Sequence, residues 1–180
     1  KENQLREETL ESTEVFAGRL VKLRVDRVRL PDGRETTREI VVHRGAVTAV
    51  PVLDDRIVMV RQFRQAAGEI LFELPAGTLD AGENPIECVR RELREEIGYL
   101  AGEIVPLFTS FLAPGYSSEM LHTFLARDLR HVGADLDEDE FLEVVEMNLD
   151  DAIDMIRAGR IRDAKTICGL LMARRVLSGD

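Results

Sequence analysis

Residues 77–99 read GTLDAGENPIECVRRELREEIGY, and this stretch decides the fold. Asn84 is a residue type that caps helices, and Pro85 suits the first helical turn. Apolar residues then recur at helical spacing, which predicts a helix with one buried stripe. The stripe consists of Ile86, Val89, Leu93 and Ile97. Gly98 is placed to end the helix, because glycine readily adopts the left-handed conformation of a C-terminal cap.

The predicted helix also gathers carboxylates. Glu92, Glu95 and Glu96 stand at positions i, i+3 and i+4, so their side chains share one face. Such a cluster repels itself unless cations lie in it. Hard oxygen ligands suit Mg²⁺ or Mn²⁺, and these ions also bind substrate phosphates. The alternative interpretation is a solvated acidic helix face.

The spacing of the whole stretch is G-x5-E-x7-R-E-U-x-E-E-x-G-U, where U is a bulky apolar residue and Tyr99 is a slightly polar last position. This pattern resembles the Nudix box, a device that holds divalent metal against a diphosphate. A merely solvated face has no need of Gly77, Glu83 and Gly98 at these positions. The resemblance implies that Arg91 pairs with Glu83.

Composition limits the classes of partner. The chain has 180 residues, which fits one domain with or without a small appendage. Its formal net charge of −10 and the lack of a Lys/Arg cluster argue against nucleic-acid binding. No apolar run approaches membrane-spanning length, so no membrane partner is expected. Cys88 and Cys168 lie far apart, and we expect neither a disulfide nor a zinc site, which fits a cytoplasmic protein.

Strand signals divide the chain. The first dozen residues are expected to be disordered or marginal. Residues 16–30 form an alternating run that predicts a strand, followed by the turn signal Pro31-Asp32-Gly33 and a second strand at 35–43. This hairpin has few large apolar residues, so we expect it to pack against something else, such as a second subunit.

The remainder predicts a layered domain. Its expected strands are 46–53, 56–63, 70–74, 103–112, 120–126 and 141–148, and its further expected helices are 149–158 and 162–177. One apolar face is predicted on the last helix, formed by Ala164, Ile167, Cys168, Leu171 and Met172. The mixture indicates an α/β or α+β fold. The Nudix resemblance sharpens this to an α/β/α sandwich with a mixed sheet, plus the small N-terminal antiparallel β hairpin.

Outside the box the chain resembles the ADP-ribose pyrophosphatase branch of the Nudix family. Residues 73–77, ELPAG, lead into the box, and residues 61–64, RQFR, precede it on a strand. Pro114 stands fifteen residues beyond the end of the box, as in that branch. The resemblance implies a homodimer, in which residues 1–44 form a β region for dimerisation and residues 45–180 form the hydrolase domain.

The family's metal roles transfer to named positions. The implied metal ligands are the backbone carbonyl of Ala76 with Glu92, Glu96 and Glu140, and Glu95 assists. Glu140 lies in the acidic stretch 135–140 and is expected to orient or deprotonate the attacking water, with Glu138 as the second choice. A solvated acidic loop is the alternative for that stretch. If it closes over the site, closure requires neutralisation by metal and substrate.

The branch also implies substrate contacts. Arg64 matches a phosphate-contacting arginine, and a guanidinium can hold a diphosphate with two hydrogen bonds. Arg38 matches a position that reaches the ligand from the dimer partner, and Glu119 faces the terminal ribose. Phe16 is a candidate to stack on adenine. The chain has no Trp, so any aromatic clamp on the base must use Phe or Tyr.

The activity implied by the resemblance is hydrolysis of ADP-ribose to AMP and ribose 5-phosphate. It requires Mg²⁺, with Mn²⁺ as the alternative, at two or three ions per site. Three other functions remain open: a Nudix pyrophosphatase for GDP-mannose, FAD, NADH or an oxidised nucleotide; an ADP-ribose-binding module without turnover; and an acidic domain with a structural role only.

Overall fold

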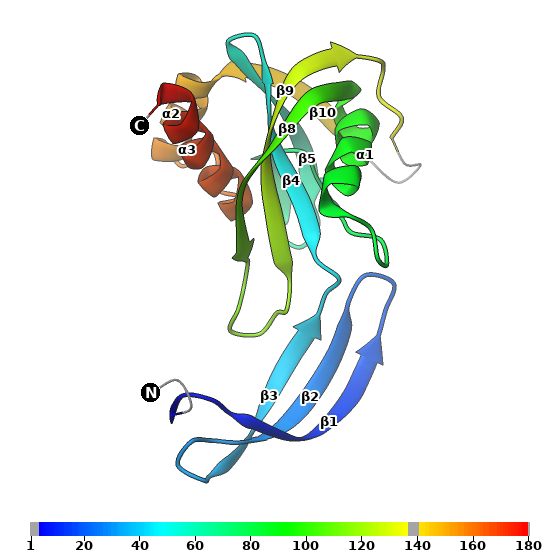
Figure 1. Cartoon of the computed structure of the whole chain (residues 1–180), viewed down its shortest axis with the longest axis vertical. Coiled ribbons are helices and arrows are strands. Elements are labelled where there is room, and N and C mark those ends of the chain that lie inside the picture. The colour runs from blue at the N-terminus through cyan, green and yellow to red at the C-terminus, as the bar shows by residue number, and fades with distance from the viewer. Residues whose placement is uncertain (1–3, 137–140, 180) are drawn as a thin grey trace. The chain divides into compact units, whose positions relative to one another are not determined.

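A computed structural model describes residues 4–136 and 141–179, which form two compact units. The first unit combines residues 1–45 with residues 111–120 (Figure 1). The second unit comprises residues 46–110 and 121–180. None of the helices in the described ranges combines the length and the apolar character that a membrane span requires.

The first unit is built on a three-stranded antiparallel sheet rather than on the two-stranded hairpin predicted from the sequence. Its strands are β1 (Glu8–Ala17), β2 (Lys22–Arg29) and β3 (Glu35–Val42), in the order β1-β2-β3. The prediction of one strand over residues 16–30 is therefore wrong. That run contains the end of β1, a turn closed by the hydrogen bond from Gly18 N to Val21 O at 2.9 Å, and β2. The predicted turn at 31–33 is confirmed, and Gly33 has a φ of +86° there.

The expectation that the first dozen residues are disordered or marginal is wrong for residues 8–12, because β1 begins at Glu8. Most side chains of β1 are exposed, so the strand shows little apolar alternation in the sequence. Instead, cross-strand ion pairs accompany its backbone ladder with β2. Arg29 Nη1 lies 2.6 Å from Glu8 Oε2, and Arg27 Nη2 lies 3.4 Å from Glu11 Oε2.

A distant segment completes the first unit. Val41 N donates to Tyr116 O at 2.8 Å, and Ser118 N donates to Val41 O at 3.0 Å. His43 N donates to Ser118 Oγ at 3.0 Å. The loop that carries Pro114 and Glu119 is thereby fastened to the end of β3.

The second unit contains a seven-stranded mixed sheet. Its strands are β4 (Ala46–Leu53), β5 (Arg56–Arg64), β6 (Glu69–Glu73), β7 (Ala76–Thr78), β8 (Tyr99–Phe111), β9 (Met120–His131) and β10 (Leu142–Asn148). The path is β10-β5-β4-β9-β8, with β6 on β5 and β7 on β4. β4 pairs with β9 in parallel, and the remaining described ladders are antiparallel. The short strand β7 was not predicted from the sequence.

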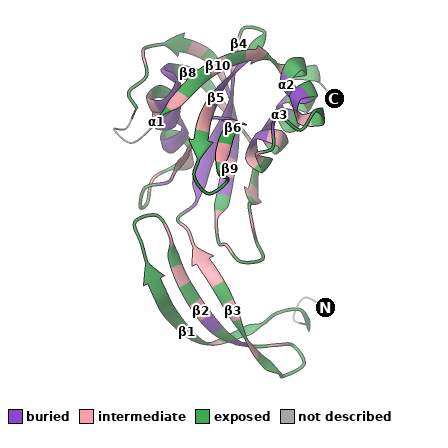
Figure 2. Ribbon diagram, turned by 180° about the vertical axis from the view of Figure 1, so that it is seen from behind, coloured by how far each residue is buried: buried purple, intermediate pink, exposed green. Residues whose placement is uncertain are grey.

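Helices cover both faces of this sheet. Figure 1 shows α1 (Pro85–Ile97) on one face and α2 (Leu149–Arg157) with α3 (Ala164–Ser178) on the other. The predicted α/β/α sandwich is confirmed. Alternate residues of the central strands enter different cores: Val58 packs with α1, and Met59 packs with α2 and α3. Figure 2 shows this burial concentrated in the second unit.

The buried face of α3 differs from the prediction. The buried residues are Thr166, Gly169, Leu170 and Ala173, whereas Cys168, Leu171 and Met172 are exposed. Thr166 is polar and Gly169 has no side chain, so hydrophobic periodicity did not predict their burial. A Cβ added at Gly169 would lie 2.6 Å from Leu74 Cδ1, which shows how closely α3 approaches that residue.

Candidate functional site

The candidate site is organised around α1, whose ends follow the sequence signals. Asn84 Oδ1 accepts a hydrogen bond from Ile86 N at 2.9 Å. Gly98 has a φ of +75°, and its N–H donates to Arg94 O at 3.1 Å. Val89 and Leu93 are buried as predicted, whereas Ile86 is exposed. These caps fix the helix and therefore fix the direction of its carboxylates.

Glu92 is buried against the backbone of β7. Only 8% of Glu92 is exposed. A Cβ added at Gly77 would lie 1.8 Å from Glu92 Oε1, so no residue with a side chain fits at position 77 while that carboxylate stays in place. The glycine in the box is thus explained by the close approach of a carboxylate, since no left-handed backbone is involved.

Glu96 faces the same short strand. It is 3% exposed, and its Oε2 accepts a hydrogen bond from Ala76 N at 2.9 Å. The two buried carboxylates of α1 are therefore aimed at neighbouring residues of β7. Pro75, just before them, is fixed as well, because its carbonyl accepts from Thr48 Oγ1 at 2.9 Å and from Ala49 N at 3.2 Å.

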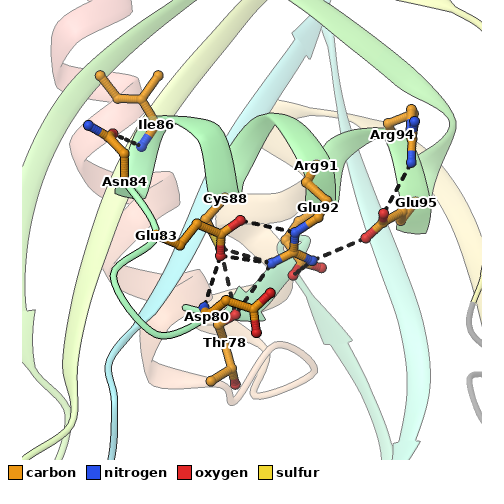
Figure 3. A network of polar contacts seen from close by, with 10 residues as sticks. All are labelled: Thr78, Asp80, Glu83, Asn84, Ile86, Cys88, Arg91, Glu92, Arg94 and Glu95. Atoms are coloured by element: carbon orange, nitrogen blue, oxygen red, sulfur yellow. Dashed lines mark hydrogen bonds and ion pairs between the residues drawn. The ribbon is translucent and has the colours of Figure 1, made fainter.

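The Arg91 guanidinium donates hydrogen bonds to three acidic residues of the site (Figure 3). Its Nε and Nη2 donate to the two carboxylate oxygens of Glu83, each at 3.1 Å. Its Nη1 donates to Glu92 Oε1 at 2.7 Å and to Glu95 Oε2 at 3.1 Å. The expected pairing with Glu83 is present. The contacts with Glu92 and Glu95 are additional, and they hold both carboxylates in defined positions.

This network shifts the ionisation of its members. The hydrogen bonds from Arg91, helped by one from Asp80 N, lower the pKa of Glu83 to about 2. The Glu83 hydrogen bond raises the pKa of Arg91 above its usual range. Burial and the neighbouring Glu83 raise the pKa of the Cys88 thiol to about 12. At neutral pH the site therefore contains ionised Glu83, cationic Arg91 and a neutral thiol.

Arg64, the predicted phosphate ligand, lies at the end of β5 and forms a two-point ion pair with Glu73 of β6. Nε and Nη2 of Arg64 lie 2.8 and 2.7 Å from the two Glu73 oxygens. That hydrogen bonding raises the pKa of Arg64, and the charge of Glu96 contributes in the same direction. Arg64 is thus in the electrostatic field of a box glutamate, although its direct partner is Glu73.

Sequence reasoning missed two residues beside Arg64. Glu73 is 1% exposed, and its Oε2 also receives Lys165 Nζ at 2.6 Å. Lys165 Nζ lies 2.9 Å from Asp163 Oδ2 as well, and Asp163 caps α3 by accepting from Thr166 N at 3.1 Å. In the sequence, Glu73 begins the segment 73–77 that leads into the box, and Asp163 is a residue type that caps helices. Neither signal indicates the pairing of Glu73 with Lys165, because the two residues are 92 positions apart.

The other predicted substrate residues belong to the first unit. Arg38 forms an ion pair with Glu7, Nη2 to Oε1 at 2.5 Å. Phe16 is 57% exposed. Glu119 Oε1 lies 3.8 Å from His43 Nδ1, and Pro114 lies in a turn closed by Tyr116 N donating to Ala113 O at 3.1 Å.

Two residues of the acidic stretch were predicted to orient the attacking water. Glu140 and Glu138 lie outside the described residues. The described part of their loop is held to α1, since Asp135 N donates to Glu95 O at 3.0 Å. The start of the acidic stretch is thereby placed beside the helix that carries the box glutamates.

Comparison with known proteins identifies the family. The family model described as "NUDIX domain" matches residues 42–170. The chain belongs to the Nudix family. A second model, "Nucleoside diphosphate sugar hydrolase N-terminal domain", matches residues 7–41, which fall in the first unit.

Individual Nudix relatives resemble nearly the whole chain. It is 41% identical to an ADP-ribose pyrophosphatase of Bacillus subtilis (strain 168), over 90% of this chain and 89% of the relative. It is also 41% identical to a methanol dehydrogenase activator of Bacillus methanolicus, over 89% of each chain. A crystal structure of an ADP compounds hydrolase superposes with a TM-score of 0.87 at 26% identity, over 97% of this chain and 96% of that one.

Nudix hydrolases generally depend on divalent metal, and the residues present fit such an ion in their chemistry. Glu92 and Glu96 supply buried carboxylate oxygens next to the backbone of β7, and hard divalent ions prefer oxygen ligands. Within the described ranges, His, Cys, Asp and Glu side chains do not form a group of three or more ready to hold an ion. Two carboxylates are thus in place, while Arg91 holds Glu95 and one oxygen of Glu92.

Proposed function

We propose that this chain hydrolyses the diphosphate bond of ADP-ribose, giving AMP and ribose 5-phosphate. The observation that carries the proposal is the pair of buried carboxylates, Glu92 against Gly77 and Glu96 against Ala76, on a complete Nudix box. The ADP-ribose pyrophosphatase at 41% identity supports the choice of substrate. We propose Mg²⁺ as the metal, with Mn²⁺ as the alternative, at two or three ions per site.

The roles proposed for the box residues follow from their positions. Glu92, Glu96 and the carbonyl of Ala76 hold the metal, with Glu140 as a further ligand. A divalent ion held by these residues would supply positive charge to the diphosphate oxygens and would lower the pKa of a water molecule. Arg91 holds Glu92 and Glu95 in a fixed orientation, because both carboxylates accept from its Nη1.

The attacking water and the phosphates need further groups. Glu140 orients the water and takes its proton, with Glu138 as the second candidate. Arg64 presents its guanidinium to the phosphate oxygens. Glu140→Gln, compared with Glu138→Gln, tests the water role. We expect the first to lower kcat by about a hundredfold or more, within the range of general base catalysis, and unchanged turnover would transfer the role to Glu138 or remove it.

The first unit is proposed to complete the substrate site in a homodimer in the cytoplasm. Arg38 then approaches the ligand from the partner subunit, Glu119 faces the terminal ribose and Phe16 stacks on adenine. The thin core of the three-stranded sheet supports this, since most of its side chains are exposed in the single chain. Light scattering at micromolar concentration should give twice the chain mass of 20.3 kDa. A monomer would remove Arg38 from the proposed site.

The decisive experiment measures turnover of ADP-ribose in Mg²⁺, with GDP-mannose, FAD and NADH in parallel. Glu96→Gln serves as the inactive variant, and Glu87→Gln is its matched control, because Glu87 lies exposed on the same helix. We expect AMP release by wild type and Glu87→Gln, and a loss of about a hundredfold or more in Glu96→Gln.

Each alternative has its own signature in this experiment. Turnover of another substrate alone would keep the mechanism and change the substrate assignment. Calorimetric binding of ADP-ribose without product would favour a non-catalytic binding module. Near-normal activity of Glu96→Gln would remove the metal assignment.

A further inference from the structure

A buried ion network lies behind Arg64. The Glu73 side chain at its centre is almost fully buried, and its carboxylate receives two cations, Arg64 and Lys165. Lys165 itself is 12% exposed, with its Nζ between Glu73 and Asp163. A carboxylate removed from water to this degree requires compensation by charge and hydrogen bonds, and here both oxygens are occupied.

The geometry of the guanidinium determines which donors remain for a ligand. Arg64 directs the edge formed by Nε and Nη2 to Glu73. Among the described residues, Nη1 has no hydrogen-bond partner, and the Arg64 side chain is 44% exposed. The edge formed by Nη1 and Nη2 is therefore left to contact a phosphate, because a guanidinium is a rigid fork with two such edges.

Lys165 alters the charge that Arg64 presents. Lys165 shares the Glu73 carboxylate at 2.6 Å and also pairs with Asp163 at 2.9 Å, so Arg64, Lys165 and the two carboxylates are formally neutral together. Without Lys165 the same network would carry one net negative charge toward the ligand. Burial by itself raises the pKa of Glu73, but the hydrogen bonds and charges of Arg64 and Lys165 outweigh it and lower the pKa overall.

The same end of α3 also fastens the strand that leads into the box. Thr166 Oγ1 accepts from Leu74 N at 2.8 Å and donates to Asp163 Oδ2 at 2.5 Å. Leu74 directly follows Glu73 and precedes the Pro75-Ala76-Gly77 backbone against which the box glutamates are buried. The start of α3 therefore contacts both the Arg64 anchor and the backbone next to the metal ligands.

We propose that Lys165 is a positioning residue for the phosphate-binding arginine: by sharing the Glu73 carboxylate, it fixes Arg64 and keeps the surrounding network from becoming net negative toward the diphosphate. The inference rests on the proposed function and extends it to residues at the start of α3. Lys165 acts through Glu73 and Arg64, so its loss should weaken substrate binding more than it slows the chemical step.

The test compares Lys165→Met with Arg162→Met in steady-state turnover of ADP-ribose. Both remove one positive charge at the start of α3, but Arg162 is 56% exposed and pairs with Glu69. For Lys165→Met we expect KM to rise about tenfold, the effect of losing one charge-assisted hydrogen bond, with kcat changed by less than about threefold. Lys165→Arg should restore most of the affinity, and Arg162→Met should stay within about twofold of wild type.

A double-mutant cycle separates positioning from a merely structural role. In an Arg64→Met background, Lys165→Met should raise KM no further, because the group through which it acts is gone. An equal rise in both backgrounds would overturn the proposal, and so would a KM within twofold of wild type in Lys165→Met. Lys165→Gln replaces Lys165→Met if circular dichroism shows that the latter is unfolded. Failure of both to fold would also overturn it, because the lysine would then serve the fold itself.

Turnover by the wild-type protein separates failure of the proposed function from failure of the role proposed for Lys165. If wild type does not turn over ADP-ribose, the proposed function fails and this inference fails with it. If wild type is active and the cycle is additive, only the role of Lys165 falls.

Discussion

Replacing Gly77 by alanine should disable the proposed metal site while leaving the fold almost intact. The new Cβ would lie 1.8 Å from Glu92 Oε1 and 1.9 Å from its Cδ, whereas ordinary contacts begin at 3.4 Å. The carboxylate must therefore move by about 1.5 Å, and misplacement by about 1 Å at a catalytic site can cost about a hundredfold in rate. Because φ at Gly77 is outside the left-handed region, the backbone itself accepts alanine.

The expected change in the free energy of unfolding combines two opposing contributions. Crowding costs about 1–3 kcal/mol, and the reduced freedom of the unfolded chain returns about 0.4–1 kcal/mol, so the fold should survive. We expect the Mn²⁺ dissociation constant to rise about 10- to 100-fold and kcat to fall about a hundredfold. Calorimetric titration with Mn²⁺ and turnover at saturating metal measure the two effects, with Glu92→Gln as the reference for a lost ligand.

Gly102→Ala is the matched control for crowding. Its Cβ would lie 2.9 Å from Asp128 Cβ, so it is also too close to a neighbour, but that neighbour is not a box glutamate. We expect a lower melting temperature with an unchanged Mn²⁺ dissociation constant. If Gly77→Ala binds Mn²⁺ and turns over within twofold of wild type, the argument from the Gly77–Glu92 contact is refuted.

Three further predictions concern α1. The folded pKa of Glu83 is about 2 against an ordinary 4.5, so its ionisation stabilises the fold above about pH 4.5 and that contribution is lost as the pH falls toward 2. The melting temperature measured by calorimetry should therefore fall more steeply between pH 6 and pH 2.5 for wild type than for Glu83→Gln. An equal fall of the melting temperature in both proteins would contradict the role of Arg91. At pH 8 a thiol reagent should modify Cys168 alone in the native protein, because Cys88 is buried with a pKa of about 12; two reactive thiols would contradict this. Asn84→Ala should lower the free energy of unfolding by about 0.5–2 kcal/mol in urea titration, and an unchanged midpoint would show that the cap is not needed.

Local signals made α1 predictable. The capping hydrogen bonds of its N-terminal cap, Asn84, and its C-terminal cap, Gly98, are made to nearby residues of the chain, so both caps could be inferred without tertiary information. The central strands β4 and β5 were predictable because helices cover both sheet faces, which requires long apolar runs.

Features that depend on distant partners were missed. β1 has an exposed, polar sequence, and its strand conformation follows from pairing with β2. The buried face of α3 contains Thr166 and Gly169, which lie against Leu74, a residue far from them in the sequence. The sequence alone likewise pointed to Arg64 but not to the Glu73 carboxylate that occupies one edge of its guanidinium.

The discontinuous first unit has a consequence for how the chain is made. His43 and its partner Ser118 are 75 residues apart, so at ordinary rates of translation about 4–15 s pass between the synthesis of β3 and the arrival of its loop. During that interval the end of β3 offers unpaired backbone groups on the nascent chain, and such edges invite pairing with other strands. A fragment cut after residue 45 would keep this defect permanently. Grafting the sheet onto another protein would therefore require residues 111–120 to be carried along with it.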